Sequence, residues 1–169
     1  MVNPDPISTA ATTATPPNSG SASALSQPDP QVSEEEQRGL RLFTGRGMCL
    51  SCHDGPHLSD GRAHNTGLAW QPADERLGTP GRFLDRGAEV ISGRASERGA
   101  FKTPTLREVA RTAPYMHDGS LATLEEVVDF YDRGGRPNPN LDREMHPLEF
   151  TEDAKKALVA FMKTLTAGE

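Results

Sequence analysis

The chain of 169 residues is long enough for one domain and carries a formal net charge of −6. This mildly acidic balance argues against a nucleic-acid-binding surface and is compatible with a basic protein partner. No apolar run approaches the roughly 18 residues that a membrane-spanning helix needs, so the sequence predicts no transmembrane segment.

Residues 1–32 are rich in Ala, Thr, Ser and Pro and have neither helical nor strand periodicity. Such a stretch cannot bury enough apolar surface to offset its ordering entropy, so we predict a disordered tail or linker. It also lacks the basic and apolar regions of a signal peptide. We therefore expect either that the natural start lies upstream or that the sequence is the back half of a longer polypeptide, in which case it could be a fragment without activity of its own.

The first helix is predicted over residues 33–44. Ser33 and Glu36 form a capping box, which marks its N-terminus. Gly39 and Phe43 lie four residues apart on one face, a pair that lets a second helix cross at close range. The glycines that end the helix are Gly45 and Gly47.

Cys49-Leu50-Ser51-Cys52-His53 follows and contains both cysteines of the chain. Cys-x-x-Cys-His is the attachment signature of c-type haem, in which two thiols bind the porphyrin and the histidine supplies an axial iron ligand. A redox dithiol and half of a zinc site are the alternatives. A redox dithiol would be expected near a βαβ pattern, which the sequence does not show. A zinc site would usually need a second Cys or His pair, and no further cysteine is available, so we predict one covalent haem c.

Residues 54–102 show no convincing long helix or strand. A loop of this length is improbable in a compact domain unless it surrounds a bound group. The haem is the obvious object, and a covalent porphyrin would also compensate for the low aromatic content of 5%. Trp70 is expected simply to pack. His57 and His64 are further nitrogen donors, which we interpret as surface or hydrogen-bonding residues.

Three further helices are predicted in the remaining chain. Pro104 suits the first position of a short helix through about Thr112. A second capping box at 123–126 starts a helix that ends at 131–132, before two glycines. After an irregular, proline-rich stretch over 136–150, the last helix opens at Thr151. Its apolar stripe consists of Leu158, Phe161, Met162 and Leu165.

A first helix that crosses a last helix, with Cys-x-x-Cys-His just after the first, predicts the cytochrome c fold. The expected fold class is therefore all-α, with a c-type cytochrome domain over residues 33–169 and long loops that wrap the haem. Without the haem motif, two ordinary amphipathic helices would be the preferred interpretation.

Several segments together resemble the bacterial dihaem cytochrome c peroxidase and MauG family, over roughly residues 34–165. The segments are Phe101–Arg107, Thr112–Gly119, Thr123–Val128, His64–Gly67, Arg98–Ala100 and Leu158–Phe161. Members of that family have two haem domains, and this chain is similar to the second, C-terminal one only. In the family, peroxide meets the haem of the first domain, and the second haem mainly takes in or stores electrons.

The resemblance implies a periplasmic oxidoreductase domain, the electron-transfer half of an enzyme that reduces peroxide or uses it to oxidise a partner protein. Implied partners are a small cytochrome or cupredoxin and a second haem domain. The single Cys-x-x-Cys-His in this chain leaves the alternative of a monohaem electron carrier without its own substrate.

The resemblance also suggests further site residues. In the family, the distal iron ligand lies fourteen residues after the histidine of Pro-Tyr-x-His-Asp-Gly, which is Tyr131 here and corresponds to the tyrosine of MauG. Met116, Met145 and an open site are the alternatives. The remaining candidates are Thr112 and Pro114 as backbone ligands of a calcium ion, Lys102 and Arg107 as partners of the haem propionates, and His117 beside Asp118 as an acid–base pair or a structural corner.

Overall fold

The computed structural model describes residues 32–167. The predicted disordered tail, residues 1–32, lies outside the described residues except for Val32. The longer helices are α1 (Glu34–Thr44), α3 (Leu124–Asp132) and α4 (Glu152–Thr164), and α2 (Glu89–Ser92) is short. The 3₁₀ turns are η2 (Cys49–Ser51), η3 (Ala95–Glu97) and η4 (Val109–Arg111).

Side-chain caps begin the three longer helices where the sequence predicts them. In α1 the Ser33 hydroxyl accepts a hydrogen bond from the backbone N–H of Glu36, whose carboxylate accepts one from the backbone N–H of Ser33. Thr123 and Glu126 form the same reciprocal pair at α3, and Thr151 caps α4. Each cap is worth about 1 kcal/mol, so the three helix starts are fixed locally.

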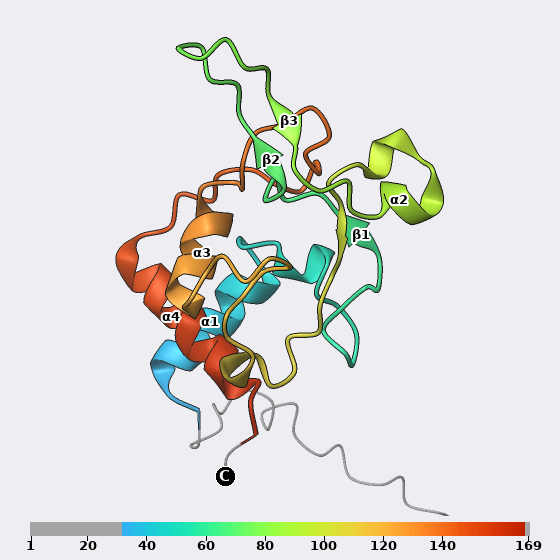
Figure 1. Ribbon diagram of the computed structural model, residues 1–169. Helices are drawn as coiled ribbons and strands as arrows, with labels where there is room; N and C mark the ends of the chain where they lie inside the picture. The colour runs from blue at the N-terminus through green and yellow to red at the C-terminus, as the bar shows by residue number, and fades with distance from the viewer. Residues whose placement is uncertain (1–31, 168–169) are drawn as a thin grey trace, which may run out of the picture. The chain divides into compact units, whose positions relative to one another are not determined.

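Helices α1 and α4 cross at Gly39. A Cβ atom at this position would overlap the carbonyl oxygen of Ala157 and lie 2.6 Å from the Cβ of Phe161, so only glycine allows this approach. One turn later, the rings of Phe43 and Phe161 pack with their centroids 5.2 Å apart. The predicted crossing of the first and last helices is therefore confirmed, and α1, α3 and α4 gather on one side of the domain (Figure 1).

The buried core joins α3 and α4 to Phe43 of α1. Its members are Phe43, Val109, Leu124, Val128, Phe150, Ala154, Leu158, Val159 and Met162. Ion pairs on the outside add a second link between the helices, since Nζ of Lys155 on α4 lies 2.8 Å from Asp129 and 3.4 Å from Asp132 on α3. The helical part of the domain is thus one packed unit.

Two short antiparallel ladders qualify the prediction of an all-α domain. β1 (Ala63–His64) pairs with β4 (Phe101–Lys102), and β2 (Trp70–Gln71) pairs with β3 (Arg82–Phe83). Trp70 packs edge-on against Phe83, with ring centroids 4.8 Å apart, as expected of a tryptophan that simply packs. The loop between β2 and β3 projects away from the three longer helices (Figure 1).

The short helix predicted from Pro104 is wrong, because only the 3₁₀ turn η4 forms in this stretch. The hydroxyl of Thr105 accepts a hydrogen bond from the backbone N–H of Arg107 and so makes a local turn. Glu108 then takes a left-handed conformation, with φ of 62°, which no α-helix can contain. The preference of proline for the first position of a helix did not outweigh these two breaks.

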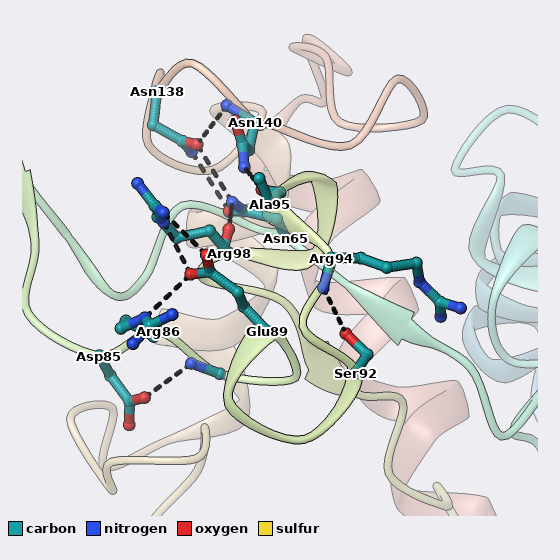
Figure 2. Close-up of polar contacts among 11 residues, drawn as sticks. Asn65, Asp85, Arg86, Glu89, Ser92, Arg94, Ala95, Arg98, Asn138 and Asn140 are labelled. Carbon is teal, nitrogen blue, oxygen red and sulfur yellow. Dashed lines mark hydrogen bonds and ion pairs between the residues drawn. The ribbon is translucent and has the colours of Figure 1, made fainter.

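A buried polar cluster holds the long loop together around α2. The carboxylate of Glu89, whose side chain is only 5% exposed, accepts two hydrogen bonds from Arg98 at 2.7 Å and one from Arg86 at 3.0 Å. Asn65 donates to the carbonyl of Arg98 and exchanges hydrogen bonds with Asn138 (Figure 2). The loop is thus fastened by specific polar contacts where it has few apolar side chains.

Replacement of Gly39 by alanine is predicted to destabilise the haem-loaded protein by about 2 kcal/mol or more, because neither backbone can move away from the added methyl group. The measurement is the free energy of unfolding from urea titration. Leu40→Ala on the same helix is the control, because Leu40 is 43% exposed, and it should change stability by about 0.5 kcal/mol or less. Equal losses in the two variants would contradict the close crossing.

Candidate haem site

The Cys-x-x-Cys-His motif forms a single helical turn directly after α1. Met48 enters the turn in a left-handed conformation, with φ of 53°, and the backbone N–H of His53 donates to the carbonyl of Cys49 at 2.8 Å. This geometry brings both thiols and the imidazole to the wall of the same cavity. The two cysteines and the histidine, which lie close together in the sequence, therefore also line one cavity.

Two cavities of about 370 and 120 Å³ lie beside this turn. They have part of their lining in common, which makes them neighbouring halves of one crevice. The shared residues are Cys52, His53, Leu106, Val127, Tyr131, Glu144, Met145 and Met162. Most of these side chains are apolar, and an apolar crevice of this kind is typical of a site for a large organic cofactor.

His53 is held by its other nitrogen. Its Nδ1 lies 2.9 Å from the carbonyl oxygen of Leu58, so Nδ1–H donates to that carbonyl and Nε2 carries the free lone pair. Burial lowers the pKa of His53 and outweighs the opposite effect of the Leu58 carbonyl. The imidazole is therefore neutral near pH 7, which is the form that binds a metal.

The two thiols have the opposite character from a redox dithiol. Burial raises the pKa of Cys49 to about 12, and burial with the nearby charges of Asp142 and Asp60 raises that of Cys52 to about 11. A reactive dithiol needs at least one depressed pKa. Zinc is no better supported, since among residues 32–167 no group of three His, Cys, Asp or Glu side chains is arranged to hold a metal ion. Two half-buried neutral thiols, a neutral imidazole and an apolar crevice fit a covalent haem c.

The three candidates for the distal position are not equally placed. Tyr131 and Met145 line both cavities, whereas Met116 lines only the larger one. Burial and the two neighbouring cysteines raise the pKa of Tyr131 to about 12. The Tyr131 hydroxyl makes no side-chain hydrogen bond within the described part of the chain, so it is available to a group in the crevice.

The weaker candidates fall into two groups. Lys102, His117, Thr112 and Pro114 all line the larger cavity. His117 stacks on Phe101 with ring centroids 3.5 Å apart. Arg107 lines neither cavity, and its guanidinium donates two hydrogen bonds to the carbonyl of Pro56. Lys102 is consequently the better placed of the two cations for a propionate.

His64 lies between two carboxylates that the sequence analysis did not single out. Its Nδ1 is 2.6 Å from Oδ2 of Asp142 and its Nε2 is 2.8 Å from Oδ2 of Asp60. We call these three residues the charged triad. Both nitrogens of His64 are engaged, as expected of a hydrogen-bonding histidine rather than an iron ligand, whereas the side chain of His57 is exposed. Asp142 is 78 positions away, and no local pattern links it to His64.

Known proteins similar to this chain are haem peroxidases and MauG proteins. The sequence is 40% identical over 157 residues to cytochrome c peroxidase IdrP1 of Denitromonas iodatirespirans and 39% identical over 136 residues to methylamine utilization protein MauG of Methylorubrum extorquens. These matches cover 82% and 80% of this chain but 42% and 36% of the relatives, so the chain spans about two fifths of their length.

A solved structure of a MauG-like protein associated with microbial copper homeostasis has the same fold, with a TM-score of 0.67 and 36% identity over 82% of this chain and 48% of that one. No protein-family model matches the sequence. Among the described residues, no helix combines the length and apolar character needed to cross a membrane. The family resemblance drawn from the sequence is confirmed by these relatives.

The charged triad predicts a stability difference that depends on pH. Burial alone lowers the pKa of His64, but hydrogen bonds from its ring to Asp60 and Asp142 outweigh burial and raise it above the ordinary value of 6.5. A raised pKa stabilises the folded protein fully below about 6.5, and this contribution is lost as the pH rises through the folded-state value.

The thermal unfolding midpoints of wild type and His64→Gln should therefore differ most near pH 5.5 and converge as the pH rises. Burial alone would raise the pKa of Asp60, but its hydrogen bonds bring that pKa to about 2, so the difference should persist well below pH 5.5. His57→Gln is the control for replacing a loop histidine. A difference that grows with pH would contradict the charged triad.

Proposed function

Because this chain is homologous to the cytochrome c peroxidase and MauG proteins, we propose that it carries one haem c and forms the electron-transfer half of an enzyme of that kind. The observation that carries the proposal is the turn at residues 49–53, where two thiols and a neutral imidazole with a free Nε2 line one apolar crevice. When bound, the haem would supply one-electron chemistry at its iron.

The proposed roles of the chain's own residues follow from their positions. Cys49 and Cys52 attach the porphyrin, and His53 is the proximal ligand, oriented by its bond to the Leu58 carbonyl. Tyr131 is the proposed distal ligand. In the absence of a cation its hydroxyl is neutral at pH 7, and a ferric ion in the crevice would favour the phenolate instead. Lys102 at the cavity wall is the proposed partner of a propionate.

The proposed overall reaction converts hydrogen peroxide, two electrons and two protons into two molecules of water, or takes the two electrons from a partner protein that is oxidised. The electrons would come from a small cytochrome or cupredoxin, and the haem that meets peroxide would be supplied by another domain or chain. An extracytoplasmic location, usual for c-type haem, belongs to the same proposal. So does a calcium ion bound through the carbonyls of Thr112 and Pro114, because calcium prefers oxygen ligands.

A monohaem electron carrier is the second candidate. It is favoured by the single Cys-x-x-Cys-His in the sequence, because a carrier needs only one haem. In that case His53 and the crevice would have the same roles, but the chain would have no substrate of its own. Turnover with peroxide separates the two candidates.

The purified protein is predicted to stain for haem after denaturing electrophoresis, since thioether bonds survive denaturation. The stain should disappear in Cys49→Ser/Cys52→Ser. Peroxide consumption, measured with a reduced small cytochrome as donor and with a peroxide-binding haem domain added, should exceed that of the added domain alone for the enzyme proposal. A stained protein with no such excess would indicate the electron carrier, and a colourless band would exclude both.

Tyr131→Phe is predicted to change the ferric absorption spectrum, because the phenolate would be lost as an iron ligand. Tyr115→Phe is the matched control. Tyr115 also lines the larger cavity, but its hydroxyl donates to the carbonyl of Val109 at 3.1 Å. We expect the control spectrum to equal that of the wild type. If the Tyr131→Phe spectrum is unchanged as well, Met116 or Met145 becomes the better assignment.

A further inference from the structure

The charged triad of Asp60, His64 and Asp142 has a net charge that follows from its geometry. An ionised carboxylate only accepts hydrogen bonds, so the two ring nitrogens of His64, each bonded to a carboxylate, must both carry protons. One imidazolium between two carboxylates leaves a net charge of −1. The three side chains are 13%, 11% and 25% exposed for His64, Asp60 and Asp142, so solvent screens this charge only in part.

The charged triad comes from two segments of the chain, residues 60–65 and 142–144, and backbone hydrogen bonds hold it in place. The backbone N–H of Arg62 donates to Asp60 at 3.0 Å, and that of Glu144 donates to Asp142 at 3.1 Å. His64 is fixed by the ladder between β1 and β4. The neighbouring Asn65 carbonyl accepts a hydrogen bond from the backbone N–H of Asp142 at 2.9 Å. Each charge therefore has a defined position.

The charges lie beside the haem crevice. His64 and Asp142 line the larger cavity together with His53. Asp60 also touches the turn itself, because its backbone N–H donates a hydrogen bond to the carbonyl of Cys52 at 2.8 Å.

We propose that the charged triad tunes the reduction potential of the haem, with His64 as a positioning residue that keeps one positive charge between two negative ones at the crevice wall. The proposal rests on the haem assignment made above. Reduction adds one electron to ferric iron, so a nearby negative charge opposes reduction and a nearby positive charge favours it. The neighbouring Arg62 is present in every variant below and contributes equally to each.

The test is a redox titration of the haem-loaded protein at about pH 6, where the imidazolium is retained because its pKa is raised above 6.5. His64→Gln removes the positive charge, and the potential should fall. Asp142→Asn removes a negative charge, and the potential should rise. In each case we expect the ratio of ferrous to ferric haem at a fixed applied potential to change roughly three- to tenfold. The control His57→Gln replaces an exposed histidine in the same loop region and should leave the reduction potential unchanged.

The opposite signs distinguish a charge effect from a bracing effect. If the charged triad only held the loops together, both variants would loosen the crevice and move the potential in the same direction, which would overturn the proposal. Two unchanged potentials would overturn it as well. If His64→Gln does not accumulate, Asp142→Glu takes its place: it keeps the negative charge and must leave the potential near that of the wild type while Asp142→Asn raises it. A wild-type protein without a haem stain would instead refute the haem assignment itself.

Discussion

The close contact between α1 and α4 at Gly39 is the constraint on which the arrangement of the site depends. The Cys-x-x-Cys-His turn begins within a few residues of the end of α1, so the position of α1 fixes the position of both thiols. Helix α4 contributes Met162 to both cavities and Leu158 to the smaller one. A methyl group at residue 39 would separate the helices and move the turn away from this wall. The glycine at this crossing therefore fixes where the turn lies relative to α4.

The features that the sequence predicts well are those encoded within a few residues. The capping boxes at Ser33 and Thr123, and the Cys-x-x-Cys-His turn, depend on neighbours within one helical turn. Pro104 misled for the opposite reason, because the left-handed Glu108 depends on a contact with the last helix, where its N–H donates to the Leu165 carbonyl. Local preference decides an element only where no distant contact competes with it.

The candidate site can be assigned from local spacing only at Cys49, Cys52 and His53, and these assignments stay predictions. Cys49, Cys52 and His53 follow from spacing, whereas Tyr131 was reached through family resemblance, since its distance from the motif carries no chemical signal. The pairing of His64 with Asp142 joins segments that no periodicity connects. The ladders and the cluster around Glu89 are likewise long-range, which is why residues 54–102 read as one unstructured loop.

The crossing of the first and last helices also has a consequence for the order of assembly. Helix α4 follows every other helix and strand of the described chain, so during synthesis the wall that it supplies is the last to arrive. Until then the crevice beside the two cysteines lacks the part of its wall that Leu158 and Met162 supply. In the proposed haem protein, attachment would therefore have a window before the chain closes, and the growing polypeptide could receive its cofactor without having to unfold.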